Sequence, residues 1–271
     1  MKIKIMQYNI RTGFRKTEKP YNYEENRIHI AKNIIKKEDP DVLILNEAYF
    51  ESKNKSGILM DYQKIFGFPF YAHGNYKNGP NPFWGHALLS KYPIIESLNK
   101  SRGLAGLFRN RIKIRNKIIN LDIAHISPIP YLSSKKQEEF IKKILADKPK
   151  SYILSGDFNS LSPEDRYDEE KMIKLWSKFE KNAKKVIGEM LKRDSIRCVL
   201  SRGLIDTYKA KNKKFGFTIP TDFLSKDKSS GIRIDYIFCS KEFKVINSGI
   251  IRNNLTEKAS DHYPIYATMD I

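Results

Sequence analysis

The alternation of polar and apolar residues at the start of the chain predicts a β-strand over residues 2–9. Mostly apolar runs predict further strands at residues 41–46, 86–90 and 151–156. Between the first two strands, residues 23–39 carry apolar side chains at helical spacing and predict a helix that stops before a proline. Strands and helices therefore alternate in the first half of the chain.

The middle of the chain predicts a β-hairpin followed by a helix. Residues 109–115 and 117–125 have the pattern of two strands joined by a tight turn. Ser134 and Gln137 have the spacing of a capping box, which predicts a helix that begins there and continues through Leu145.

The last part of the chain changes from helix back to strand. Residues 168–191 follow a strongly helical pattern, and strands resume at residues 233–239 and 264–270. We find no internal repeat and no linker rich in Pro, Gly or Ser. We therefore expect one domain over residues 1–271, with a helical insertion at about 162–202.

Short polar segments gather where the predicted strands end. They are residues 7–10, 45–48, 124–127, 156–160 and 260–264, and Asp235 lies within the strand at 233–239. Each segment alone also fits a local structural role, such as a strand-end salt bridge or an Asx turn. Together they indicate a single site for metal-assisted hydrolysis of a phosphoester.

Carboxylates and an amide supply the first part of that chemistry. Hydrolysis at neutral pH requires a hard cation, an activated water and donors for the developing charge. Glu47 ends an apolar strand, where an unpaired carboxylate would be costly, and its oxygens suit Mg²⁺. Asp157 and Asn159 follow another apolar strand two residues apart, so alternation directs both side chains to one side.

Two histidines supply proton transfer and phosphate contacts. Histidine is the side chain whose ordinary pKa suits proton transfer near neutrality, which favours His262 as an acid or base. Asp235 is the candidate partner that fixes its tautomer, and His125 offers a second imidazole at a strand end. A lone strand-end histidine is more often structural, but two of them among several polar strand ends favour a catalytic site.

The chain is strongly basic, with 50 Lys and Arg against 31 Asp and Glu and a formal net charge of +19. This excess favours a polyanionic partner, nucleic acid first and an anionic membrane surface second. A lysine-rich surface without such a partner is an equal alternative, because the charge is spread along the whole chain. The hydrophobic content of 40% argues against wholesale disorder.

Other classes of protein are disfavoured. The two cysteines, Cys198 and Cys239, argue against a disulfide framework or a structural zinc site. The start of the chain does not have the pattern of a signal peptide, and no apolar run is long enough for a transmembrane helix. We therefore expect a soluble, cytoplasmic protein.

The polar segments in this order, with residues 85–93, resemble the endonuclease/exonuclease/phosphatase superfamily. That superfamily includes deoxyribonuclease I-like and exonuclease III-like phosphoesterases, and the resemblance extends from residue 2 to residue 270. It implies an α/β fold, a four-layer α/β/β/α sandwich of two packed, mixed and largely antiparallel sheets with helices outside. The site is implied at one edge of the two sheets.

The resemblance also implies roles for individual residues. The implied metal ligands are Asn9, Glu47 and Asp261, and the implied catalytic residues are His125, Asp157, Asn159, Asp235 and His262. In this assignment Asp157 positions or deprotonates the attacking water, while His262, paired with Asp235, acts in proton transfer or transition-state stabilisation. Asn159 and His125 contact the phosphate. Mg²⁺ is the implied cofactor, with Mn²⁺ as a possible substitute, and the number of metals stays open.

The substrate is less determined than the chemistry. Abasic-site endonucleases of the exonuclease III type usually carry a tyrosine where His125 stands, so the match is to the histidine-bearing branch. We expect a nuclease acting on DNA or RNA, with Arg11, Arg15 and Lys16 as candidate substrate-binding residues. Further basic positions are Arg109, Arg111, Lys113 and Arg115 in the predicted hairpin.

Two alternatives remain open, a phosphodiesterase or phosphatase of a lipid or inositol-phosphate headgroup and a catalytically silent nucleic-acid-binding module. An open basic groove would favour a nucleic-acid strand, and a closed pocket would favour a headgroup. An aromatic run could offer bases a stacking surface or belong to the core; it consists of Phe66, Phe68, Phe70, Tyr71, Tyr76, Phe83 and Trp84. A monomer is expected.

Overall fold

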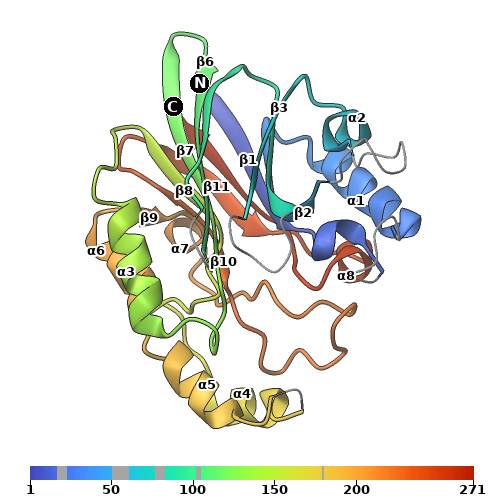
Figure 1. Ribbon diagram of the computed structural model, residues 1–271, viewed down its shortest axis with the longest axis vertical. Coiled ribbons are helices and arrows are strands. Elements are labelled where there is room, and N and C mark those ends of the chain that lie inside the picture. The colour runs from blue at the N-terminus through green and yellow to red at the C-terminus, as the bar shows by residue number, and fades with distance from the viewer. Residues whose placement is uncertain (17–22, 51–60, 77–82, 102–104, 179) are drawn as a thin grey trace.

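The computed structural model in Figure 1 describes residues 1–16, 23–50, 61–76, 83–101, 105–178 and 180–271. The described residues form two six-stranded sheets that pack face to face, with helices on the outside. The first sheet has the order β11-β12-β1-β2-β4-β3 and consists of β1 (Lys2–Asn9), β2 (Val42–Tyr49), β3 (Phe70–Asn75), β4 (Trp84–Ser90), β11 (Lys244–Ile250) and β12 (Ile265–Asp270). The second has the order β5-β6-β7-β8-β10-β9 and consists of β5 (Ile94–Asn99), β6 (Ala105–Ile114), β7 (Lys117–Ile126), β8 (Tyr152–Asp157), β9 (Ile205–Asp206) and β10 (Asp235–Cys239).

Both sheets are mixed and largely antiparallel. β1 and β2 form a parallel pair, as do β7 and β8, and the other neighbouring strands are antiparallel. This arrangement confirms the predicted fold class.

Helices cover the outer face of each sheet (Figure 1). The first sheet carries α1 (Glu25–Glu38), α2 (Tyr62–Phe66) and α8 (Thr256–Ala259), and the short 3-10 helix η1 (Thr12–Phe14) follows β1. The second carries α3 (Ser134–Ile144) and α6 (Asp194–Ser201), and α7 (Thr207–Lys211) follows β9. α4 (Glu169–Trp176) and α5 (Ala183–Met190) lie at one end of the molecule, opposite the β6–β7 hairpin and the two termini. No helix in these described ranges is long and apolar enough to cross a membrane.

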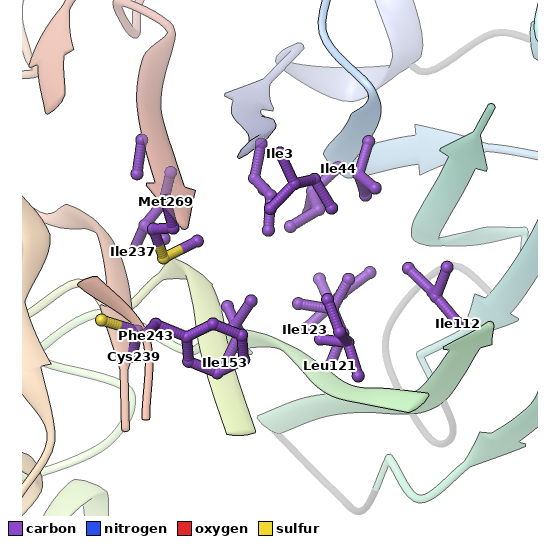
Figure 2. Packing of buried hydrophobic residues seen from close by; sticks show 14 of the residues in the cluster. Ile3, Ile44, Ile112, Leu121, Ile123, Ile153, Ile237, Cys239, Phe243 and Met269 are labelled. Atoms are coloured by element: carbon purple, nitrogen blue, oxygen red, sulfur yellow. The ribbon is translucent and has the colours of Figure 1, made fainter. Parts of the chain in front are cut away.

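The two-residue period of the strands separates an inner core from an outer one. Ile3 and Ile5 of β1 point into the space between the sheets, whereas Met6 and Tyr8 pack against α1. Figure 2 shows this inner core, to which strands of both sheets contribute branched apolar side chains. Truncating a fully buried residue such as Ile5 to alanine would cost about 2–5 kcal/mol, so this layer holds the sheets together.

The same alternation builds the polar end of the molecule. Gln7 and Asn9 share the inner face with Ile3 and Ile5, so the space between the sheets changes from apolar to polar towards the end of β1. The corresponding inner positions on β2, β7, β8 and β10 are Asn46, His125, Ser155, Asp157 and Asp235. These polar residues therefore converge at one edge of the packed sheets.

Most predicted elements are present, with two corrections. The hydroxyl of Ser133, not of Ser134, caps α3 by accepting from the Lys136 amide, and Gln137 donates to the Ser127 carbonyl at 3.0 Å. The predicted capping box at Ser134 and Gln137 is therefore wrong, because the cap is Ser133 and the Gln137 side chain bonds elsewhere. The helical pattern at 168–191 forms two helices, α4 and α5, instead of one.

Candidate active site

A cleft of about 440 Å³ opens at the polar edge of the two sheets. Five of the predicted site residues line it, namely Glu47, His125, Asp157, Asn159 and His262. They come from the ends of β2, β7 and β8 and from the segment before β12. Segments more than 200 residues apart in the chain thus meet at one point.

A β-bulge directs Glu47 into the cleft. The pairing of β2 with β4 shifts between Leu45 and Ala48, and Glu47 has a φ of 57°. Because of this irregularity, the consecutive residues Asn46 and Glu47 both contribute to the site, which a regular strand would not allow. A non-glycine residue with positive φ is uncommon and typical of functional positions.

The Glu47 carboxylate is held in its ionised form. It accepts a hydrogen bond from Asn9 Nδ2 at 3.1 Å and another from the Thr12 amide at 2.9 Å. Burial raises the pKa of Glu47, but the charge of His125 and these two hydrogen bonds outweigh burial and lower the pKa below its ordinary value. The site thus keeps a negative charge at this position.

Asp157 lies at the centre of the site and is almost fully buried. Its carboxylate accepts from Asn9 Nδ2 at 3.0 Å and from the Asn159 amide at 2.9 Å. The Nε2 atoms of His125 and His262 lie 3.7 and 3.9 Å from its Oδ2. Burial, followed by the charge of Asp235, raises the pKa of Asp157 to about 6. Such a carboxylate can exchange a proton near neutral pH.

His262 and Asp235 form a buried hydrogen-bonded pair. Nδ1 of His262 donates to Asp235 Oδ2 at 2.8 Å, and Gln7 Nε2 donates to Asp235 Oδ1 at 3.0 Å. Burial lowers the pKa of His262, but the charge and hydrogen bond of Asp235 raise it more, with Asp261 and Asp157 adding to the effect. The net result is a pKa well above the ordinary value, which favours a protonated imidazole at neutral pH.

His125 has a different partner, Tyr76, just after β3. The Tyr76 hydroxyl accepts from the Glu47 amide at 3.2 Å and lies 2.8 Å from His125 Nδ1. The Tyr76 hydroxyl thus connects the Glu47 backbone to the His125 ring. This contact fixes the orientation of the imidazole, whose Nε2 faces Asp157.

The donors of the cleft fit a hard divalent cation. Ligand atoms of Glu47, His125 and Asp157 lie within 4.8 Å of one another. No Lys or Arg in the described ranges forms an ion pair with Glu47, Asp157 or Asp235, and the partners of Asp157 and Asp235 are the imidazoles of His125 and His262. Glu47 is only partly buried, and a carboxylate in that setting without a Lys or Arg partner is typical of a metal ligand.

The remaining predicted residues lie beside the cleft. Asp261 Oδ2 is 3.4 Å from Arg11 Nη1, so an expected metal ligand and an expected substrate-binding residue pair with each other. Arg15 is buried with its guanidinium 4.1 Å from the centre of the Tyr49 ring, and Lys16 is exposed. None of the three basic residues lines the cleft among its described walls.

The basic hairpin lies away from the site. Gly106 pairs with His125 at the site end of β6, whereas Ile114 pairs with Lys117 at the turn. Eight residues at about 3.3 Å each place the turn roughly 26 Å from the site end of the hairpin. Along the way, Arg109 pairs with Asp122 and Arg111 with Glu96.

Sequence reasoning placed Gln7, Asn46 and His86 in the segments that indicate the site and Tyr76 in an aromatic run, but it gave none of them a catalytic or metal-binding role. Gln7 and Asn46 are joined by a 2.9 Å hydrogen bond in a buried network, and Asn46 Nδ2 lies 3.0 Å from His86 Nδ1. The polar character of Gln7 and Asn46 inside apolar strands is a signal that could have found them. No local signal distinguishes Tyr76 from its aromatic neighbours.

Comparison with known proteins agrees with the geometry. A sequence model described as the Endonuclease/Exonuclease/phosphatase family matches residues 6–262. No curated protein sequence matches closely enough to count as a relative.

Solved structures with the same fold cover nearly all of the chain. An endonuclease/exonuclease/phosphatase family protein from Leptotrichia buccalis is 20% identical, covering 99% of this chain and 100% of its own, with a TM-score of 0.66. The 3′ phosphatase NExo from Neisseria bound to a product DNA hairpin is 17% identical, covering 99% and 100%, with a TM-score of 0.67. TDP2 from D. rerio complexed with a single-strand DNA product is 16% identical, covering 100% and 99%, with a TM-score of 0.63. At these identities the likeness shows the fold alone.

Proposed function

Because this chain belongs to the endonuclease/exonuclease/phosphatase family, a family of metal-dependent phosphoester hydrolases, we propose that it cleaves a phosphodiester in a nucleic acid by attack of water. The observation that carries the proposal is the convergence of Glu47, Asp157 and the His262–Asp235 pair on one cleft.

Mg²⁺ is the proposed cofactor, with Mn²⁺ as a substitute. Glu47 is the proposed principal ligand, with Asn9 and Asp261 beside it, and the ionised state of Glu47 supports this role. When bound, such an ion neutralises phosphate charge and polarises the phosphoryl group.

Side chains of the protein then accept and donate the protons of the reaction. Asp157 orients the attacking water and accepts its proton, for which a pKa of about 6 is suited. The water oxygen bonds to phosphorus as the bond from phosphorus to the leaving oxygen breaks. His262, kept protonated by Asp235, donates a proton to that leaving oxygen. His125 and Asn159 contact the equatorial oxygens of the phosphate.

Nucleic acid is the first proposed substrate. The net charge of +19 supports a polyanion, as do the solved structures of NExo and TDP2 with DNA products. Arg11 and Lys16, which follow β1, are the proposed contacts to the nucleic-acid backbone. The guanidinium of Arg15, expected from the sequence to bind substrate, is buried against Tyr49 and is not included.

A small phosphoester is the second candidate, and one observation favours it. Apart from its catalytic groups, the cleft has mainly apolar walls, and its described lining residues include no Lys or Arg. A nucleic-acid strand would bring further phosphates, which need basic partners. Of the alternatives proposed from the sequence, a lipid headgroup such as that of sphingomyelin would bring no phosphate besides the scissile one, and the lining favours it. An inositol polyphosphate would bring further phosphates, and the lining does not favour it.

Hydrolysis assays with the purified protein and Mg²⁺ test both candidates. The substrates are plasmid DNA, single-stranded DNA, RNA, sphingomyelin and an inositol polyphosphate, each with and without EDTA. We expect cleavage of a nucleic acid that disappears with EDTA and in Asp157→Ala. Turnover of only a lipid or inositol substrate would move the assignment to the second candidate. Activity that survives both EDTA and Asp157→Ala would refute the proposed chemistry.

A further inference from the structure

One part of the wall of the cleft is apolar. It is lined by Ile129 and Tyr131 of the segment between β7 and α3, Trp176 and Met190 of the insertion, and Ile232 and Ile234 before β10. The apolar wall and the catalytic groups line the same cleft, and several wall residues are close in sequence to catalytic residues. Ile234 precedes Asp235, and the segment that contains Ile129 directly follows the strand that carries His125.

The helical insertion contributes side chains to this wall and is packed against the rest of the domain. Met172 of α4 and Ile187 of α5 are fully buried in a cluster that includes Ile232 and Ile234, so the two helices are anchored to the segment before β10. This anchoring places Trp176 and Met190, at the ends of α4 and α5, on the cleft. The wall therefore does not depend on a ligand to form it.

The charge of the wall decides what it can bind. The chain as a whole carries a net charge of +19, yet none of the described residues that line the cleft is Lys or Arg. A second phosphate next to the scissile one would find no cation there, and its desolvation would be costly. An uncharged aromatic or aliphatic group would instead bury its apolar surface against the wall.

We propose that this wall is a subsite for an uncharged, apolar group carried by the scissile phosphate as one of its ester substituents. The proposal rests on the proposed phosphoester hydrolysis at the same cleft. The volume of about 440 Å³ is within the range of small-molecule sites, about 300–1,000 Å³, and accommodates a single ring system beside the phosphate. A nucleobase or an aryl or acyl group has the required chemistry, and the insertion determines the preference among esters.

Binding of two phosphonates that are not hydrolysed tests the subsite directly. Isothermal titration calorimetry of the protein in Mg²⁺ compares phenylphosphonate with methylphosphonate. Burial of the additional ring surface predicts at least about tenfold tighter binding of phenylphosphonate. Trp176→Ala should reduce this ratio. Tyr131→Ser should reduce it as well and leaves the core intact, because Tyr131 is 73% exposed. Ile118→Ser, at an exposed position of β7 near the hairpin turn, is the matched control and should leave the ratio unchanged.

Binding of thymidine 5′-monophosphate shows whether the apolar group in the subsite is a nucleobase or an aryl or acyl group. If Trp176→Ala weakens its binding as much as that of phenylphosphonate, the occupant is a nucleobase; if only phenylphosphonate responds, it is an aryl or acyl group. Equal affinity for the two phosphonates, or a ratio that both variants leave unchanged, would overturn the subsite. Hydrolysis of bis(p-nitrophenyl) phosphate, abolished by EDTA, is measured in parallel. If that activity is present while the ratio test fails, only the subsite is wrong; if no substrate is hydrolysed, the proposed function itself fails.

Discussion

Replacing Asp235 by asparagine separates catalysis from folding at the buried pair. The substitution keeps the shape of the side chain but removes the charge that lies 2.8 Å from His262 Nδ1. A hydrogen bond to a charged group contributes about 1.5–3 kcal/mol. At 1.36 kcal/mol for each factor of ten, its loss predicts a rate decrease of roughly 10- to 150-fold.

The pH dependence gives the sharper readout. Asp235 raises the pKa of His262, so Asp235→Asn lowers that pKa and the alkaline limb of the rate profile moves to lower pH. Asp235 also raises the pKa of Asp157, so the acid limb moves to lower pH as well. Because a bound cation also favours the carboxylate form, the acid limb of the unchanged protein should lie at or below about pH 6.

Rates across both limbs, measured with bis(p-nitrophenyl) phosphate and saturating Mg²⁺, check this shift. Asp270→Asn is the matched control, because Asp270 pairs with the N-terminus at the opposite end of the molecule. Thermal unfolding of both variants shows whether each is folded at the assay temperature. A profile of Asp235→Asn with unchanged limbs and an unchanged rate would refute the role of the pair.

Three further predictions concern the metal, the second imidazole and the fold. Glu47→Gln should weaken the Mg²⁺ dependence of the rate while the protein stays folded, and an unchanged Mg²⁺ titration would make Glu47 structural. Tyr76→Phe removes the hydroxyl between the Glu47 amide and the His125 imidazole, so kcat should fall roughly tenfold with little change in KM; equal kcat values would contradict the positioning role of Tyr76. Asp165→Asn breaks the buried ion pair with Arg233 and should cost about 3–5 kcal/mol in urea denaturation, whereas Asp168→Asn, in an exposed pair, should change stability by about 0.5 kcal/mol or less.

The interior of each sheet could be predicted from the sequence, but its edges could not. The predicted strands correspond to β1, β2, β4, β6, β7, β8, β10 and β12, which all have a neighbour on both sides. The strands without a prediction are β3, β5, β9 and β11, which are the four edges of the two sheets in the described residues. Edge strands bury less surface, as the half-exposed pattern of β5 shows, and so lack the apolar signal that identifies interior strands.

The candidate site was predictable where a polar residue interrupts an apolar strand. Asp157 and His125 are such residues, and period-two alternation placed both on the inner face. The partners that arrive from distant segments had no comparable signal. Tyr76 follows an edge strand, and the ion pair between Arg233 and Asp165 joins residues 68 positions apart. Arg233 begins the predicted strand that carries Asp235, but its guanidinium is buried between the carboxylates of Asp165 and Asp206.

The net positive charge says little about the substrate, because many of the basic residues are paired with carboxylates or lie far from the cleft. Basic residues of the hairpin, such as Arg109 and Arg111, are paired with carboxylates, and its turn lies roughly 26 Å from the site end of the hairpin. Since the Debye length at physiological ionic strength is about 8 Å, charges at that distance affect the approach of an anionic substrate more than its binding. Selectivity at the phosphate must then come from contacts inside the cleft. Those contacts are carboxylates, imidazoles and the apolar wall, so the group attached to the phosphate should matter more than the length of the polyanion behind it.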